Sequence, residues 1–164
     1  MFSIRSRMLK KRLEKELQAC KKTIQHKIIL ISEKDEFPVV LEVCLVDAQT
    51  PVMNANGILE RIHDGRFIIE ISEEYPWKKP VVRWLTQIFH PNIMPPEEGG
   101  YVCTKLLDTW SCSSSIAELI NGIEILAANP NPDSPIASES CKKTAEYFKN
   151  YWKLKNEIYE AERH

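Results

Sequence analysis

Cys103 is the side chain with the clearest capacity for covalent chemistry, because it follows an irregular loop instead of lying in an apolar run. A free thiol has a pKa near 8.5, so about 3% of it is thiolate at neutral pH. No histidine is adjacent to Cys103 in the sequence, and the nearest cation is Lys105. A cysteine protease needs a histidine partner. His26, His63 and His90 are available in principle, but no protease motif surrounds the cysteine. A thiol without a dedicated base suits attack on a thioester, which is intrinsically easy, better than amide hydrolysis.

The composition disfavours several other classes of function. The chain has 22 basic and 23 acidic residues, and a net charge of −1 is unusual for a nucleic-acid-binding protein. The cysteines are odd in number, widely spaced and without a CxxC pair, which argues against a disulfide framework and a zinc site. They are Cys20, Cys44, Cys103, Cys112 and Cys141. No apolar run reaches the roughly 18 residues of a membrane span, and Met1–Lys22 lacks the apolar centre of a signal peptide. We therefore expect a cytoplasmic protein with reduced thiols and no bound metal or cofactor.

The first half of the chain predicts one helix followed by four strands. An apolar stripe at spacings of mostly three and four predicts the helix, Ser6–Lys22. The stripe consists of Met8, Leu9, Leu13, Leu17 and Cys20. Runs rich in Val, Ile and Leu predict the strands, which are Lys27–Ser32, Phe37–Val46, Arg66–Ser72 and Val81–Leu85. The segment from Asp47 to Gly65 is rich in turn-forming residues and is predicted to be a loop.

A second irregular segment, Pro91–Gly100, separates the strands from the helices. It contains three prolines and two glycines, so it cannot form a regular helix or strand. Long irregular segments inside a compact domain tend to be functional. Ser115 and Glu118 then form a capping box at the start of a strongly apolar helix that ends near Ala127.

The last part of the chain predicts two more helices. Ser134 followed by Pro135 is typical of an N-cap and a first helical residue, which opens a helix to about Phe148. A charged amphipathic helix then runs to the C-terminus. The order predicts one α+β domain over residues 1–164. It has an N-terminal helix, a four-stranded antiparallel meander, a central buried helix and two C-terminal helices.

Several short motifs follow one another in an order that resembles the ubiquitin-conjugating enzyme family. They are YPWKKP from Tyr75 to Pro80, TQIFHPNI from Thr86 to Ile93, GYVC ending at Cys103, Trp110-Ser111, and NPNPDSP from Asn129 to Pro135. The first two resemble the family's YPFxPP and HPN signatures. The stretch from Lys11 to Leu17 resembles the family's first helix. The similarity extends over nearly the whole chain and implies the UBC-like form of the α+β fold.

The resemblance implies roles for residues around the cysteine. Cys103 matches the nucleophile that accepts ubiquitin, or a ubiquitin-like protein, as a thioester from an activating enzyme. Asn92 matches an asparagine that either supports the oxyanion during attack by a lysine or holds the catalytic loop, and both roles are compatible. His90 is expected to be a structural, buried imidazole. Ser134 matches a residue that positions the incoming lysine, with Asp133 as a carboxylate beside it, while the helix N-cap is the alternative role for Ser134.

Further positions match surfaces that bind partner proteins. Trp77, and the loop with Trp110 and Ser111, match the two loops that the family presents to RING-type ligases. Packing is the alternative for Trp77 and the stronger interpretation for Trp110. Arg12 and Lys15 match the surface shared by the activating enzyme and the ligase. The implied partners are therefore ubiquitin or a relative, an activating enzyme, a RING-type ligase and protein substrates with lysines.

Four features depart from the family pattern and indicate a divergent member. Asn92 and Cys103 are about three residues further apart than is usual, and Pro95–Glu98 accounts for the extra length. Lys105 stands where an acidic or polar residue is common, and Cys112 replaces a usual proline. The segment Val46–Arg66 is also longer than its counterpart. The alternative function is a non-catalytic variant of the same fold that binds ubiquitin or a conjugating enzyme.

Overall fold

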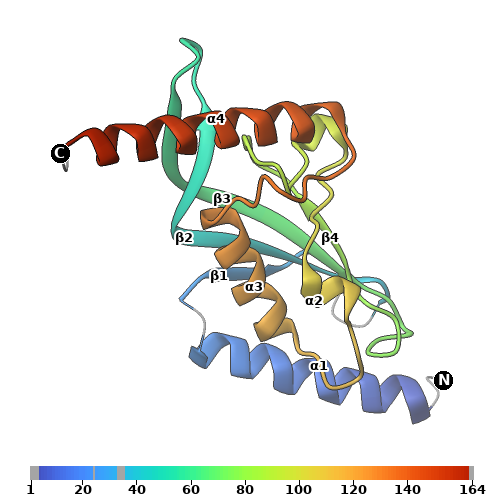
Figure 1. The fold of residues 1–164 in the computed structure, drawn as a ribbon. Coiled ribbons are helices and arrows are strands. Elements are labelled where there is room, and N and C mark those ends of the chain that lie inside the picture. The colour runs from blue at the N-terminus through green and yellow to red at the C-terminus, as the bar shows by residue number, and fades with distance from the viewer. Residues whose placement is uncertain (1–3, 24, 33–35, 163–164) are drawn as a thin grey trace.

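The computed structural model describes residues 4–23, 25–32 and 36–162. In this part of the chain, a four-stranded sheet is combined with four helices and one 3₁₀ turn (Figure 1). The helices are α1 (Ile4–Thr23), α2 (Lys105–Asp108), α3 (Ile116–Ala128) and α4 (Glu139–Glu162), with a 3₁₀ turn, η1, at Pro96–Glu98. The strands are β1 (Lys27–Leu30), β2 (Val39–Met53), β3 (Leu59–Ile71) and β4 (Val81–Trp84). Helices α1 and α4 lie at opposite ends of the molecule.

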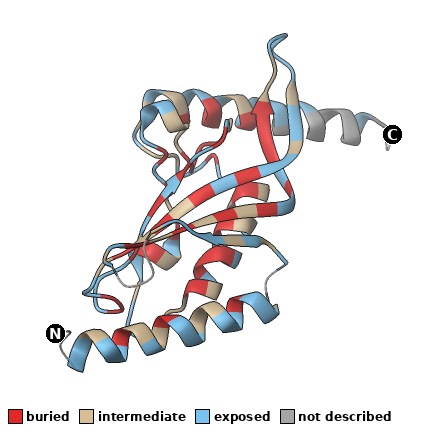
Figure 2. Cartoon of the chain, turned by 180° about the vertical axis from the view of Figure 1, so that it is seen from behind, coloured by how far each residue is buried: buried red, intermediate tan, exposed pale blue. Residues whose placement is uncertain are grey.

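The sheet is the antiparallel meander that the sequence predicts, with the strand order β1-β2-β3-β4. Alternate residues of the strands are buried on one face, as a sheet with one covered side requires (Figure 2). Phe67, Ile69 and Ile71 of β3 are fully buried on this face. Helix α3 packs against it, and its capping box between Ser115 and Glu118 is formed as predicted.

Helix α1 contributes the predicted apolar stripe with one exception. Leu9, Leu13 and Cys20 are buried in the core, and Leu17 packs against it. Met8 is 68% exposed, so its assignment to the buried stripe was wrong. It lies on the face of α1 that lines a surface groove described below. Among the described residues, no helix is long and apolar enough to cross a membrane.

The segment from Asp47 to Gly65 is not the loop that its composition predicts. It is a two-stranded continuation of β2 and β3, with its turn after Asn54 and an irregularity between Val46 and Thr50. Pro51 is tolerated there because β1 pairs with β2 only from Leu41 to Cys44, so no described strand needs an N–H donor from Pro51. The carbonyl oxygen of Pro51 accepts a hydrogen bond from the backbone N–H of Phe89 at 2.8 Å, which ties the hairpin to the body of the protein.

The C-terminal part contains one helix instead of the two predicted, since α4 is continuous from Glu139 to Glu162. No glycine or proline interrupts this segment. The final residues 163 and 164, which the prediction also included, lie outside the described part. Ser134 is not the N-cap, because α4 begins five residues later and the Ser138 hydroxyl accepts a hydrogen bond from the N–H of Cys141.

Candidate functional site

Cys103 is held next to Asn92 by a short antiparallel pairing. The backbone N–H of Cys103 donates to the carbonyl of Asn92 at 3.0 Å, and Ile93 forms a bridge with Val102. The N–H of Met94 donates to the carbonyl of Tyr101 at 2.8 Å. The two segments therefore run side by side, and the residues between them form a closed loop. The longer spacing between Asn92 and Cys103 leaves the two residues adjacent.

The extra residues of this loop form the turn η1. The backbone N–H of Gly99 donates to the carbonyl of Pro96, and the N–H of Gly100 donates to the carbonyl of Pro95. Gly100 has φ = 66°, and a Cβ atom there would collide with the carbonyl oxygen of Trp84, so only glycine fits this position. The Glu98 carboxylate accepts a hydrogen bond from the hydroxyl of Ser140 in the first turn of α4. The insertion is thus an ordered part of the site.

The Cys103 side chain is partly exposed at the start of the short helix α2, which the sequence did not predict. Thr104 caps this helix, with its side chain accepting from the N–H of Leu106 at 3.1 Å. Burial raises the pKa of the Cys103 thiol above its ordinary value, and the nearby Asp108 carboxylate raises it further. Lys105 is exposed at the first position of α2. The thiol is therefore mostly protonated at neutral pH.

The Asn92 side chain is buried, and all of its hydrogen bonds go to the segment before α4. Its Nδ2 donates to the carbonyls of Asn131 at 3.0 Å and Ser134 at 2.9 Å, and its Oδ1 accepts from the N–H of Asn131 at 2.8 Å. These bonds use both amide protons. In this conformation the amide holds the loop, and none of its protons is available to an oxyanion.

The same bonds explain why Ser134 does not cap a helix. Its carbonyl is held by Asn92, and the N–H of Ile136 donates to the carbonyl of Pro91 at 2.9 Å. The Ser134 side chain is exposed. The Asp133 carboxylate is also exposed and lies 3.8 Å from the ammonium of Lys149. Both side chains therefore face solvent next to the loop that Asn92 anchors.

His90 is buried and bonded through both ring nitrogens to the backbone. Its Nδ1 accepts from the N–H of Asn92 at 3.0 Å, so its Nε2 carries the proton that is donated to the carbonyl of Leu126 at 2.8 Å. Burial lowers its pKa from 6.5 to about 4. The imidazole is thus neutral at pH 7 and connects the HPN segment to the last turn of α3.

A second feature, the α1–loop groove, lies at the other end of α3. It has a volume of about 510 Å³, with walls formed by α1, by the loop around Trp77 and by Cys112. The Trp77 side chain is 66% exposed, and the guanidinium of Arg5 lies 5.0 Å from the centre of its ring. Ile4 and Met8 are exposed at its edge. An exposed tryptophan beside other apolar side chains is typical of a protein-binding surface.

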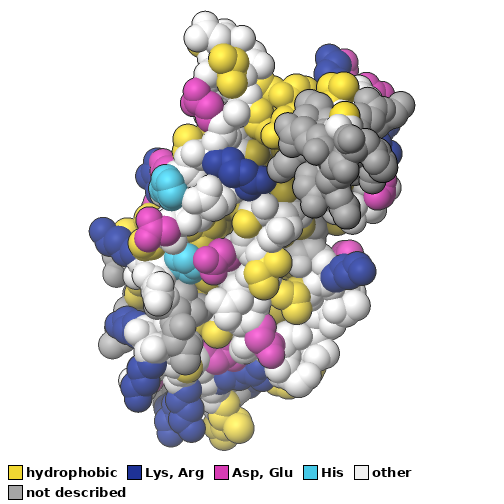
Figure 3. All heavy atoms as spheres, turned by 60° about the vertical axis from the view of Figure 1, so that its left-hand side comes forward, with side chains coloured by type: hydrophobic (Ala, Val, Ile, Leu, Met, Phe, Trp, Pro, Cys, Tyr) yellow, Lys and Arg dark blue, Asp and Glu magenta, His cyan; other side chains and the backbone are white. Residues whose placement is uncertain are grey.

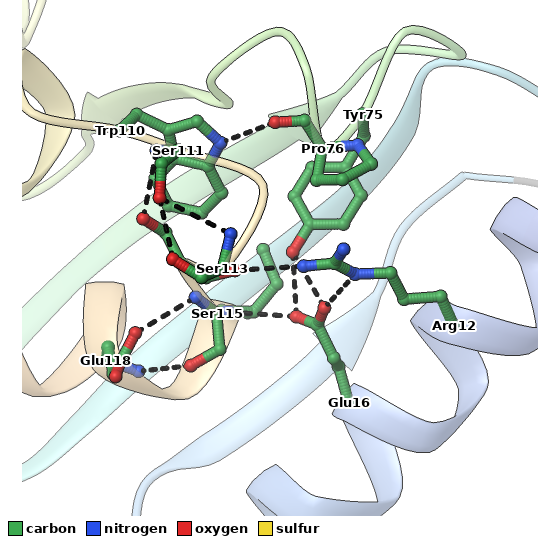
Figure 4. Close-up of polar contacts among 11 residues, drawn as sticks. Arg12, Glu16, Tyr75, Pro76, Trp110, Ser111, Ser113, Ser115 and Glu118 are labelled. Atoms are coloured by element: carbon green, nitrogen blue, oxygen red, sulfur yellow. Dashed lines mark hydrogen bonds and ion pairs between the residues drawn. The ribbon is translucent and has the colours of Figure 1, made fainter.

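The carboxylate of Glu16 is hydrogen-bonded to two residues that line this groove, Arg12 and Tyr75 (Figure 4). It accepts a hydrogen bond from the Tyr75 hydroxyl, whose oxygen lies 2.9 and 2.8 Å from the two carboxylate oxygens. It also accepts one from the backbone N–H of Ile116 at 3.0 Å. The Arg12 guanidinium donates to it at 2.7 Å and to the carbonyl of Ser114 at 3.0 Å. Burial, followed by the hydrogen bond to Glu16, raises the pKa of Tyr75 well above its usual value. Glu16 was not predicted as a site residue, although it lies within the stretch that resembles the family's first helix.

The remaining predicted partner residues lie around the same groove. Trp110 is half-buried, and its Nε1 donates to the carbonyl of Pro76 at 2.9 Å, so it joins the two loops. Ser111 is exposed in the turn that follows and shares a hydrogen bond with Ser113. Lys15 is exposed on α1, where it lines a shallow pocket together with Arg12 and Glu16. Within the described ranges, no cluster of metal-ligating side chains is present.

Comparison with known proteins places this architecture in one family. The family model for ubiquitin-conjugating enzymes matches residues 12–159. The mouse protein "Ubiquitin-conjugating enzyme E2 T" is 34% identical over 78% of the chain and 60% of its own length. An Arabidopsis thaliana "Ubiquitin-conjugating enzyme E2 3" is 33% identical over 58% of the chain and 62% of its own length. The chain thus spans about three fifths of these relatives.

Solved structures share the fold. Yeast Ubc12 superimposes with a TM-score of 0.62 at 25% identity, over 84% of this chain and 73% of its own. The E2 domain of a Toxoplasma gondii ubiquitin conjugating enzyme gives a TM-score of 0.64 at 21% identity, over 87% of this chain and 90% of its own. The chain belongs to the ubiquitin-conjugating enzyme family, and its α+β fold is of the UBC-like type.

Proposed function

We propose that this protein carries ubiquitin or a ubiquitin-like protein as a thioester on Cys103 and transfers it to a lysine. The observation that carries the proposal is the position of Cys103, partly exposed at the end of the paired segment that begins at Asn92. Its thiol has no activating base among the described residues near it, and burial raises its pKa. Thioester exchange needs no such base, whereas amide hydrolysis does.

The reaction consists of two acyl transfers. The Cys103 thiolate attacks the thioester carbonyl on the activating enzyme, a new S–C bond forms, and the cysteine of that enzyme leaves as a thiolate. A lysine amine then attacks the carbonyl on Cys103, and the Cys103 thiolate leaves. The amine must lose a proton, and exposed Asp133 beside Ser134 is the carboxylate that we assign to favour this loss.

The α1–loop groove is the surface that we assign to the ligase of RING type and to the activating enzyme. Trp77 supplies an exposed aromatic anchor, and Arg12 and Lys15 give the adjoining face of α1 a positive charge. Arg12 also bonds Glu16, so it shapes the groove in addition to lining it.

A charging assay tests the proposal. The chain is incubated with activating enzyme, ATP and each available modifier, and adducts are separated on non-reducing gels. Wild type and Cys44→Ala should form an adduct that thiols reverse, and Cys103→Ala should form none. Cys44 is the matched control because it is partly exposed like Cys103 and lies on β2, outside both candidate surfaces. An adduct on Cys103→Ala would assign the thioester to another cysteine, and no adduct on folded wild type with its cognate activating enzyme would favour the non-catalytic binding variant.

A further inference from the structure

A second apolar groove separates α1 from the edge strand β1, on the side of α1 away from the Trp77 loop. Its wider part has a volume of about 460 Å³ and is lined by Leu17, Lys21, Ile28 and Leu30 among others. It continues along α1 toward Lys10. The floor is apolar and includes Leu41 of β2. We call this feature the α1–β1 groove.

The strand that forms one wall of the groove has an unused hydrogen-bonding edge. The N–H of Ile31 donates to the carbonyl of Val40 at 2.8 Å, so in an antiparallel ladder Ile29 also faces β2. The backbone groups of Ile28 and Leu30 then point away from the sheet. Within the described part of the chain, no residue pairs with them.

The side chains at this edge point into the groove. Ile28 is opposite Val43 and Leu30 is opposite Leu41, and both partners are buried on the inner face. An added strand would therefore place every second side chain between β1 and α1. An open strand edge beside an apolar groove is the arrangement that binds peptides by strand addition.

The charges near the groove indicate which way such a peptide lies. Lys21 lines the groove beside Ile28, and Lys22 and Lys27 flank the connection between α1 and β1. Basic side chains gather at the lower end of the face in Figure 3, where α1 lies. Antiparallel addition, the more stable form, brings the C-terminal end of the peptide to this basic end. Glu14 and Glu36 line the rest of the groove.

We propose that the α1–β1 groove binds an extended segment of a partner protein by antiparallel strand addition to β1. The segment has two apolar residues two positions apart, opposite Leu30 and Ile28, followed by acidic residues that meet Lys21. The groove does not include Cys103, so the peptide-binding proposal and the thioester proposal can be tested separately.

A synthetic fluorescent peptide tests the proposal with the full chain. It contains Thr-Leu-Thr-Leu-Thr followed by three aspartates, and its affinity is measured by fluorescence anisotropy. Binding in the micromolar range is expected for so short a strand. N-methylation of either leucine removes a donor to β1 and should weaken binding at least about tenfold. N-methylation of the central threonine, whose N–H faces solvent, is the matched control and should change affinity less than about threefold.

Two protein measurements locate the peptide. Lys21→Glu should weaken binding by about threefold or more and reduce its salt dependence, whereas Lys142→Glu on α4 should leave binding unchanged. Hydrogen exchange of the Ile28 and Leu30 amides should slow when the peptide binds. Equal loss from both kinds of N-methylation, absence of binding, or unchanged exchange would overturn the proposal. A dimer in sedimentation that protects the same amides would overturn it too, by assigning the edge to a second copy.

Discussion

Acidification should destabilise this protein through His90. In the native state the ring is buried and its Nδ1 accepts a hydrogen bond from the N–H of Asn92, so protonation would break that bond. The pKa of His90 is lowered from 6.5 to about 4 in the folded protein. Above pH 6.5 the ring is neutral in both the folded and the unfolded state, so the contribution of His90 to stability is fully present. Below it, the unfolded state binds a proton that the native state does not, so the free energy of unfolding falls as the pH falls.

The magnitude follows from the separation of the two pKa values. A difference of one pH unit corresponds to about 1.4 kcal/mol, so a separation of about 2.5 units gives a loss of about 3 kcal/mol between pH 6.5 and 4. About 2 kcal/mol of this should be lost by pH 5. Such a change is a large fraction of the stability of a small domain.

Urea denaturation at a series of pH values measures the effect. The control is His90→Gln, which keeps a donor for the carbonyl of Leu126 but cannot titrate. The variant should be less stable at pH 7 and should lose less free energy than wild type between pH 6.5 and 4. The difference between the two curves isolates His90 from all other titrating groups. Parallel curves for wild type and variant would refute the assignment of a neutral, buried imidazole.

Three further substitutions test other contacts of the two candidate surfaces. Asp108→Asn should lower the pKa of Cys103 and raise its rate of alkylation at pH 7 about twofold, measured by mass spectrometry of the labelled peptide. An unchanged rate would mean that burial alone sets this pKa. Tyr75→Phe removes a hydrogen bond to the Glu16 carboxylate and should cost about 1.5–3 kcal/mol in urea denaturation. A cost below 0.5 kcal/mol, on the order of a surface substitution, would contradict the role of that bond. Gly100→Ala should cost at least about 2 kcal/mol, because it meets a strand carbonyl and has a positive φ, and a folded variant of wild-type stability would exclude the clash.

Periodic patterns predicted the parts of the fold that depend on local sequence. Most of the apolar stripe of α1 and the capping box of α3 were correct because each is determined by a few neighbouring side chains. The adjacency of Asn92 and Cys103 was suggested by the resemblance, and the pairing of Ile93 with Val102 accounts for it despite the inserted turn.

Long-range hydrogen bonds determine the parts that the sequence did not predict. Ser134 and Pro135 have the residue types of a helix start, but the Asn92 amide holds the carbonyl of Ser134 outside the helix. Pro51 disfavours a strand, but the missing outer neighbour and the bond from Phe89 make one possible. These partners are distant in sequence, 42 residues apart for Asn92 and Ser134, so no local pattern contains them.

Helix α3 connects the two candidate surfaces through its ends. At its start, the N–H of Ile116 is bonded to Glu16, which also holds Tyr75 beneath the α1–loop groove. In its last turn, the carbonyl of Leu126 accepts a hydrogen bond from Nε2–H of His90. The other ring nitrogen of His90 accepts a hydrogen bond from the backbone N–H of Asn92. Both bonds satisfy helix-terminal groups that would otherwise lack a partner. A single helix therefore joins Glu16 of α1 to the segment that holds Asn92 beside the thiol.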